Sequence, residues 1–128
     1  MKEPVWVLRE TVLALQEELL AQFGGSAGIR EEHLLDSALA RPQHLFAYRK
    51  PSGFDLAASY GFGLVKNHPF VDGNKRIGFT VAVLFLEINR YRFHAAETDA
   101  VVRTLALATG EMSETAYAKW LKTNSKRA

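Results

Sequence analysis

Hydrophobic residues recur every three or four positions along most of the chain, which is the spacing of amphipathic helices. Between Leu8 and Phe23, for example, apolar residues follow this spacing and charged residues fill many of the positions between them. Gly24 then ends the pattern, as glycine commonly does at a helix C-terminus. The same spacing predicts six helices, at residues 8–23, 30–40, 55–66 and 74–90 and in two segments that begin at Thr98 and Ser113. Because helix follows helix, we expect an all-α bundle.

The helix expected at residues 74–90 is apolar on nearly all sides between Ile77 and Ile88, as is typical of a helix surrounded by others. Gly78 lies within it and lowers helix stability by about 1 kcal/mol relative to alanine, so we expect another helix to cross closely there. The helix before it carries alanines and glycines that would allow such an approach. The chain is therefore expected to form one domain, residues 1–128, around this central buried helix.

Three segments are expected to break or end the helical pattern. Pro42 should close the second helix, because the residue before a proline is disfavoured in the helical conformation. Residues 43–53 then predict a short extended flap, or alternatively a connecting loop held by Leu45 and Phe46. The tail, residues 122–128, is polar and basic, and we expect it to fray.

The last two helices are expected to begin at residues that cap them with a side-chain oxygen. Thr98 and Ser113 are the predicted caps. The residues of the fifth helix that we expect to face the core are Val101, Val102, Leu105 and Ala106.

Composition is that of a globular protein and excludes several functions. The 128 residues are 48% hydrophobic and 23% charged, which suits a single core. A net charge of +2 gives no strong basic field, so direct nucleic-acid binding is not expected. The absence of cysteine excludes disulfides and thiolate chemistry. The longest apolar run, residues 77–88, is shorter than the roughly 20 residues that span a bilayer. The chain start does not resemble a signal peptide, so we expect a cytoplasmic protein with no membrane partner.

Polar residues of distinct chemistry are concentrated in residues 68–76, His-Pro-Phe-Val-Asp-Gly-Asn-Lys-Arg, directly before the buried helix. Backbone N–H groups at a helix N-terminus lack intrahelical partners and attract anions. Gly73 can adopt a positive φ, which lets backbone amides approach a phosphate closely. Lys75 and Arg76 supply cationic donors suited to phosphate oxygens.

Two further residues of this segment are suited to the chemistry of group transfer. Asp72 offers the oxygen ligand that magnesium prefers when phosphates also bind the ion. His68 can accept a proton near neutral pH, as a general base must. Taken singly, these residues would be read as a helix cap, a turn residue and solvated charges. Their combination predicts a site for phosphoryl or nucleotidyl transfer.

The same nine residues resemble the signature of the Fic/Doc superfamily, His-Pro-Phe-x-x-Gly-Asn-x-Arg. They also fill every fixed position of the narrower Doc (death-on-curing) pattern, His-x-Phe-x-Asp/Asn-Ala/Gly-Asn-Lys-Arg. Upstream, residues 28–30 and 34–42 look like the front half of the Doc branch. The resemblance implies the helical Fic fold and an ATP-dependent transferase.

Two positions distinguish this chain from the adenylyl-transferring Fic enzymes. Those enzymes have glycine at the position of Lys75 and a second arginine at the position of Phe79. In Doc-like proteins, lysine at the first position accompanies ATP bound in the reversed sense and transfer of its γ-phosphate. The resemblance therefore implies a protein kinase, with AMP transfer to a protein hydroxyl as the alternative.

The resemblance also implies roles for the catalytic groups. His68 would deprotonate a serine or threonine hydroxyl, and Asp72 would hold a Mg²⁺ ion that bridges the ATP phosphates. The side chains of Lys75 and Arg76 would neutralise the charge that develops during transfer.

ATP itself is expected to bind at the start of the buried helix. The backbone amides of Gly73, Asn74 and Lys75 would cradle its phosphates, and Arg76 would add its guanidinium. The extended reading of residues 43–53 resembles the flap of Fic-type enzymes, which would align a protein substrate by adding a strand.

Resemblance to Doc further implies protein partners. The substrate of Doc-like proteins is elongation factor Tu, and its modification halts translation. Self-inhibited Fic proteins carry Ser/Thr-x-x-x-Glu-Gly/Asn, in which the glutamate pairs with the motif arginine. No glutamate of this chain is followed by glycine or asparagine, so we expect inhibition by a separate antitoxin chain.

Two functions of other classes remain open from the residues alone. A non-catalytic module could bind a nucleotide or another phosphate through the same loop, and it would have no use for His68 as a base. A metal-dependent nuclease would need more carboxylates near Asp72 than the loop supplies.

Overall fold

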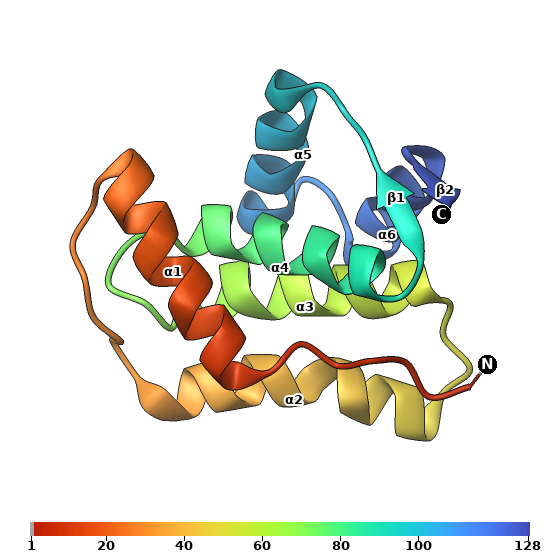
Figure 1. The fold of residues 1–128 in the computed structure, drawn as a ribbon, viewed down its shortest axis with the longest axis horizontal. Helices are drawn as coiled ribbons and strands as arrows, with labels where there is room; N and C mark the ends of the chain where they lie inside the picture. Colours follow the sequence, from red (N-terminus) through yellow and green to blue (C-terminus); the bar gives the residue numbers. More distant parts are fainter. Residues whose placement is uncertain (1) are drawn as a thin grey trace.

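The computed structural model describes residues 2–128, which form stacked helices and one small two-stranded sheet (Figure 1). The elements in chain order are α1 (Arg9–Phe23), α2 (Glu32–Tyr48), α3 (Gly53–Asn67), α4 (Asn74–Ile88), β1 (Tyr91–Phe93), α5 (Glu97–Thr109), α6 (Glu114–Thr123) and β2 (Ser125–Arg127). This confirms the predicted all-α bundle. None of the helices formed by residues 2–128 is both long and apolar enough to cross a membrane.

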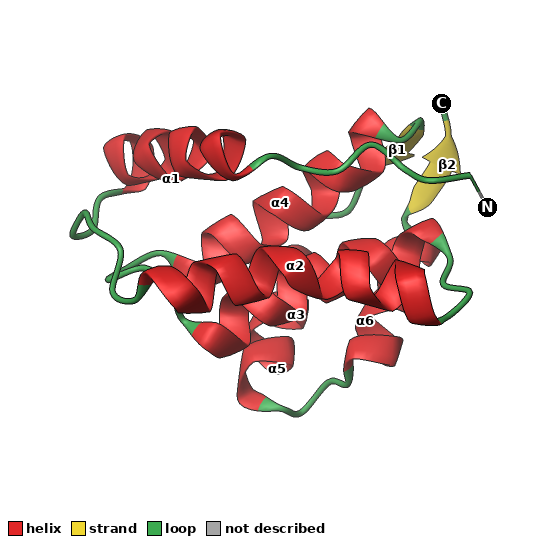
Figure 2. Cartoon of the chain, turned by 90° about the horizontal axis from the view of Figure 1, so that it is seen from below, coloured by secondary structure: helices red, strands yellow, loops and turns green. Residues whose placement is uncertain are grey.

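The bundle is organised around the pair α3 and α4. Helices α2, α3 and α4 are stacked in Figure 1, and α3 also contacts α6. The core-facing residues Leu56, Tyr60 and Leu64 of α3 are fully buried. The central helix α4 buries Ile77, Phe85 and Leu86 completely, whereas its Val83 and Leu84 are partly buried. Helices α1 and α5 lie on either side of α4 (Figures 1 and 2).

Helices α3 and α4 cross at glycines. A Cβ atom at Gly78 would lie 2.8 Å from Val65 Cγ1 and 3.2 Å from the Gly61 carbonyl oxygen. On the other side of α3, a Cβ atom at Gly63 would lie 3.2 Å from the Ala38 backbone of α2. The close crossing predicted at Gly78 is therefore confirmed. Because α3 ends and α4 begins at the polar segment, this crossing fixes both helix ends that flank it.

Helix α2 continues through Pro42 to Tyr48, so the prediction that the proline ends it was wrong. The buried residues of α2 follow helical spacing up to and including the proline: Leu35, Ala38, Leu39 and Pro42. Burial of this side compensates for the hydrogen bond that a proline cannot donate. The flap expected at residues 43–53 was also wrong, because residues 43–48 are helical and residues 49–52 connect α2 to α3.

The side of α5 that faces the core differs from the predicted one. Its buried residues are Ala100, Thr104 and Leu107. The predicted core residues are instead exposed by 61% at Val101, 61% at Val102 and 48% at Leu105, and Ala106 is half-buried. The helix begins at Glu97 with Ala96 before it, so the predicted cap Thr98 lies inside the first turn.

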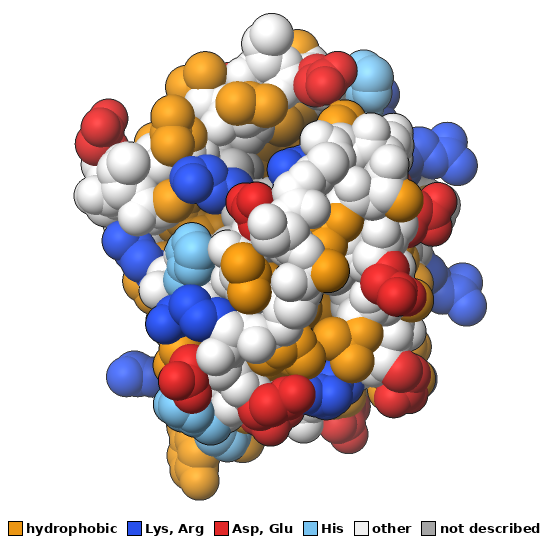
Figure 3. Space-filling model, turned by 90° about the vertical axis from the view of Figure 1, so that its left-hand side faces the viewer, with side chains coloured by type: hydrophobic (Ala, Val, Ile, Leu, Met, Phe, Trp, Pro, Cys, Tyr) orange, Lys and Arg blue, Asp and Glu red, His pale blue; other side chains and the backbone are white. Residues whose placement is uncertain are grey.

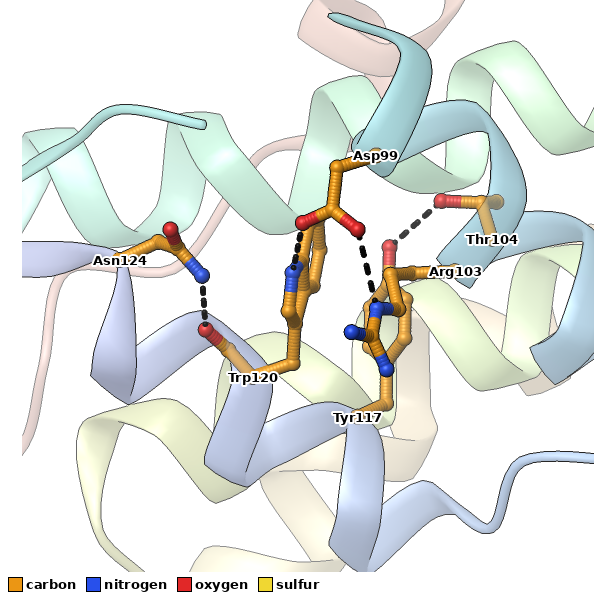
Figure 4. Close-up of polar contacts among 6 residues, drawn as sticks. All are labelled: Asp99, Arg103, Thr104, Tyr117, Trp120 and Asn124. Atoms are coloured by element: carbon orange, nitrogen blue, oxygen red, sulfur yellow. Dashed lines mark hydrogen bonds and ion pairs between the residues drawn. The ribbon is translucent and has the colours of Figure 1, made fainter. Parts of the chain in front are cut away.

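Polar contacts dock α5 onto α6 (Figure 4). Asp99 accepts hydrogen bonds from Trp120 Nε1 at 2.8 Å and from Arg103 Nε at 3.1 Å. The hydrogen bond from Trp120 has the larger effect and that from Arg103 the smaller, and together they hold the pKa of Asp99 below its ordinary value. The Thr104 and Tyr117 hydroxyls lie 2.8 Å apart in the core. Hydrogen bonding therefore contributes to the choice of the buried side of α5.

The C-terminal tail forms a strand. Strand β2 pairs with β1 in antiparallel register, with Ser125 opposite Phe93. Beyond it, Ala128 N donates to the Arg90 carbonyl at 2.9 Å. The expectation that residues 122–128 fray was wrong, because pairing with β1 supplies backbone partners that the composition of the tail does not reveal.

Candidate active site

The loop between α3 and α4 begins at His68, which ends α3. The backbone of His68 is left-handed, with φ 53° and ψ 54°, a conformation that costs a non-glycine residue of order 1 kcal/mol or more. Its side chain is exposed. Strained backbone beneath an exposed histidine is a feature that suggests a functional site, since the surrounding structure must stabilise it.

A segment between α1 and α2 holds the start of this loop. Arg30 Nε donates to the His68 carbonyl at 2.8 Å, and Arg30 Nη2 donates to the Asn67 carbonyl at 3.0 Å. The guanidinium therefore caps the C-terminal carbonyls of α3, where a cation is favoured. Alongside, Val71 N donates to the Gly28 carbonyl at 3.0 Å. The extended segment beside the motif thus comes from the α1–α2 connection, not from the flap predicted after α2.

Asn74 closes the loop on itself. Its Oδ1 accepts a hydrogen bond from Phe70 N at 3.0 Å, and its Nδ2 donates to the Phe70 carbonyl at 3.0 Å. Asn74 is 4% exposed and Phe70 is 1% exposed. The side chain of Asn74 therefore shapes the loop, and its backbone N–H is the group left for the anion contact we predicted.

Asp72 is held by neighbours on three sides. Its Oδ1 accepts from Gly73 N at 3.1 Å, and its Oδ2 accepts from Ser26 N at 3.2 Å. Its carbonyl accepts from Gln16 Nε2 on α1 at 2.8 Å. The residue itself remains exposed, so its carboxylate is oriented and still accessible.

A magnesium ion fits this carboxylate only as a shared ligand. Among residues 2–128, no group of three or more His, Cys, Asp or Glu side chains lies together in a way that could hold a metal ion. Asp72 would supply one oxygen, and phosphates and water would complete the coordination, which is the usual way that Mg²⁺ is held beside a nucleotide.

The start of α4 is open to an anion. Gly73 precedes the helix with φ 77°, which confirms the left-handed conformation that glycine was expected to provide. No side chain caps this end of the helix. Backbone N–H groups of the first turn are therefore available to an anionic ligand, and the positive end of the helix dipole favours it.

Lys75 and Arg76 follow on the first turn, but they lie differently. Lys75 is exposed, whereas Arg76 is half-buried against α1. Arg76 Nη1 donates to the Leu19 carbonyl at 3.4 Å, and its guanidinium lies 5.2 Å from the centroid of the Phe23 ring. Neither cation has a carboxylate partner within the described part of the chain, so both charges are available to a phosphate.

Beside this turn lies a groove of about 710 Å³ between α1, α4 and α5. Its walls are mostly apolar and include Phe23, Val101 and Leu105. Lys75 and Arg76 line the part of the groove nearest the motif. Figure 3 shows the face that carries the α3–α4 loop, where basic side chains and a histidine gather next to hydrophobic ones.

Gln16, Ser26 and Arg30 contact the motif, yet the sequence alone gave them no role. The glycine-rich run at residues 24–28 was the one sequence feature that could have pointed to this segment. Gly24, Gly25 and Gly28 all have positive φ, so the backbone there is irregular. The side chains of Gln16 and Arg30 and the backbone N–H of Ser26 have partners about forty residues or more away in the chain. These contacts become visible only when the helices are assembled.

Comparisons with known proteins agree with the motif. The profile of the Fic/DOC family matches residues 6–86, more than half of the chain. Toxin Doc of Mycolicibacterium smegmatis is 45% identical over 71 residues, which cover 52% of this chain and 53% of that protein. The chain thus spans about half the length of the curated relative it matches. These findings confirm the resemblance to the Doc branch, and the chain belongs to the Fic/DOC family.

Proposed function

We propose that the protein is a Doc-like toxin that transfers the γ-phosphate of ATP to a serine or threonine hydroxyl of a protein. The observation that carries the proposal is the exposed, left-handed His68 beside an uncapped helix N-terminus that bears Lys75 and Arg76. One group there can take a proton and the others can hold phosphates. By resemblance to Doc, the acceptor protein is elongation factor Tu, and its modification would arrest translation in the cytoplasm.

The proposed step uses the groups of the loop as follows. The acceptor hydroxyl oxygen bonds to the γ-phosphorus as the bond from that phosphorus to the bridging oxygen of ADP breaks. The hydroxyl proton passes to the imidazole of His68, and ADP leaves with the electron pair of the broken bond. The backbone amides of Asn74 and Lys75, with the Lys75 and Arg76 side chains, stabilise the charge on the transferring group. The Gly73 N–H, which we also expected to contact the phosphates, donates instead to Asp72 Oδ1 in this structure.

Mg²⁺ is the proposed cofactor, and Asp72 would hold it. When bound, the ion neutralises charge on the ATP phosphates. The contribution of the chain is to orient the carboxylate, which the N–H groups of Gly73 and Ser26 do in this structure.

The surroundings of Phe79 support phosphate transfer over AMP transfer. Its ring lies 5.8 Å from that of Phe93 and 6.3 Å from that of Trp120. The position that carries a second arginine in adenylyl-transferring Fic enzymes is therefore part of an aromatic cluster here, and it offers no donor to a phosphate.

A separate antitoxin chain is the proposed inhibitor, and the groove beside α4 is its proposed docking site. The exposed Val101 and Leu105 of α5 would pack against an apolar helix face. At the end of the groove nearest the motif, a carboxylate of the antitoxin would pair with Arg76, which forms no ion pair with any Asp or Glu of the described residues. The complementarity is thus apolar along the groove and electrostatic at the site.

Substitution of His68 distinguishes the proposed kinase from a non-catalytic phosphate-binding module. We expect His68→Ala to reduce phosphate transfer at least about 100-fold, because general-base catalysis contributes that much or more, and to leave the dissociation constant for ATP close to that of the wild type. His44→Ala, at an exposed histidine near the far end of α2, is the control. Transfer that persists in His68→Ala would contradict the assignment of the base. Expression of the wild type alone should slow bacterial growth, and His68→Ala should relieve this.

A further inference from the structure

The groove between α1, α4 and α5 begins at the proposed phosphate site. Its volume is about 710 Å³, within the range of pockets that bind small molecules. Lys75 and Arg76, on the first turn of α4, line the end beside the motif, and the groove follows α4 from there to Val83. This stretch is about 12 Å of helix, at a rise of about 1.5 Å per residue. A ligand held by its phosphates at the motif therefore has room to extend along α4.

Large apolar side chains form the walls of this groove and are left uncovered by the fold. Val101 and Leu105 lie one turn apart on α5, so they share a side of the helix, and both line the groove. Phe23 of α1 is 57% exposed and lines it as well. The rings of Phe79 and Phe93, also in the lining, lie 5.8 Å apart. Aromatic and aliphatic surfaces of this kind bind the flat faces of a purine base.

A few polar groups are interspersed among the apolar walls. Thr80, His94 and Glu97 line the groove, and a hydroxyl, an imidazole and a carboxylate together offer hydrogen-bond donors and acceptors. Adenosine presents both kinds of group, at the edge of its base and at its ribose hydroxyls. Apolar walls with a small number of polar groups are typical of small-molecule sites. The groove therefore has the chemistry of a nucleoside site.

Transfer of the γ-phosphate sets the direction in which ATP must lie. The acceptor hydroxyl and the γ-phosphate have to meet at His68, in the loop that precedes α4. The nucleoside is at the opposite end of the triphosphate and so extends away from this loop. The groove leaves the loop at Lys75 and Arg76, which is the direction that the nucleoside requires.

We propose that this groove holds the adenosine of ATP, with the base packed against Phe23, Val101 and Leu105. The inference rests on the proposed function, in which ATP is the phosphate donor, and it adds where the nucleoside lies. Because the antitoxin is proposed to pack against the same walls, bound adenosine and a docked antitoxin exclude each other.

Binding of ATP and of inorganic tripolyphosphate to the full chain, measured by calorimetry with Mg²⁺ present, separates the nucleoside from the phosphates. For the double variant Val101→Asn/Leu105→Asn we expect ATP to bind about tenfold more weakly, since stacking of a base contributes an effect of this order. Tripolyphosphate should bind as it does to the wild type. Val102→Asn is the control, because Val102 is as exposed as Val101, at 61%, but does not line the groove. It should change neither affinity.

Each other outcome of this titration counts against the proposal. Unchanged ATP affinity in the double variant, with a wild type that binds ATP, contradicts the nucleoside site alone. Equal weakening of ATP and tripolyphosphate does the same, because it places the effect at the phosphates. A wild type that binds neither ligand contradicts the proposed function and the nucleoside site with it.

Photo-crosslinking gives a second readout that needs no substitution. ATP with a photoreactive azide on its base should label residues that line the groove, as located by mass spectrometry of the wild-type protein, and excess ATP should abolish the label. Crosslinks confined to other parts of the chain would overturn the proposal.

Discussion

At the scale of single residues, Asn74 closes the motif loop with two hydrogen bonds. Both groups of its amide bond the backbone of the buried residue Phe70. Asn74→Ala would leave one N–H and one carbonyl without partners in the core. We expect the free energy of unfolding to fall by about 3 kcal/mol, from roughly 1–3 kcal/mol for each unsatisfied group, as measured by urea denaturation.

Asn67→Ala is the matched control for this substitution. Asn67 donates a single, partly buried hydrogen bond to the Leu34 carbonyl, so its removal should cost about 1 kcal/mol. Equal losses in the two variants would show that Asn74 does not close the loop as described.

The sequence predicted the components of the site better than their neighbours. His68, Asp72, Gly73, Lys75 and Arg76 could be proposed because each has chemistry suited to phosphate transfer and all lie within nine residues. The side chains that orient them could not be proposed, because a polar residue in an amphipathic helix or a loop gives no local sign of its partner. The roles of all these residues in catalysis remain proposals.

At the scale of helices, two glycines at the α3–α4 crossing should respond to alanine in opposite directions. A Cβ at Gly78 would come within 2.8 Å of Val65 Cγ1, whose branched side chain is stiff and buried. A Cβ at Gly61 would meet ordinary contacts of 3.5 Å or more. We expect Gly78→Ala to destabilise the protein by about 1–3 kcal/mol through overpacking.

Gly61→Ala should be neutral or should stabilise the protein by up to about 1 kcal/mol, because alanine favours the helix and the space accepts a methyl group. Thermal or urea unfolding of the pair measures both. Destabilisation of similar size in the two variants would mean that the crossing is not closest at Gly78.

Helix positions were predicted well where apolar spacing alone determines them, and less well where tertiary contacts decide. α1, α3 and α4 lie where expected, and Ser113 caps α6 as predicted, accepting from Ala116 N at 3.0 Å. Pro42 was misjudged because local propensity disfavours it within a helix, whereas its burial in the fold stabilises the longer helix. The core side of α5 was misjudged because Thr104 is buried through its bond to Tyr117, a preference that hydrophobicity does not register.

At the scale of the whole molecule, the buried Tyr117 makes stability depend on alkaline pH. Burial raises its pKa to about 12, although the hydrogen bond with Thr104 opposes this shift. The unfolded chain releases this proton near the ordinary tyrosine value of 10.0, whereas the folded chain retains it until about pH 12. Because Tyr117 is protonated in both states below pH 10, its contribution to the free energy of unfolding is fully present there. As the pH rises from 10 to 12, this contribution is lost, by up to roughly 3 kcal/mol.

Tyr117→Phe isolates this contribution. The variant should lose less stability than the wild type between pH 10 and 12 in urea unfolding, and a smaller slope should remain from Tyr60, whose pKa burial also raises. If the free energy of unfolding fell equally with pH in the two proteins, Tyr117 would not titrate differently in the folded and unfolded chains.

Transfer of the γ-phosphate of ATP by the whole protein, with His68 as the base, can be tested directly. The most direct measurement incubates the protein with Mg²⁺, a bacterial lysate and ATP labelled at either the α or the γ position, with His68→Ala as the control. We predict His68-dependent label on a protein from the γ position only, on a band that identifies the substrate. Label from the α position would establish AMP transfer and contradict the interpretation of Lys75 and Phe79. Absence of His68-dependent label from either position would contradict the kinase and leave a phosphate-binding module as the function of the loop.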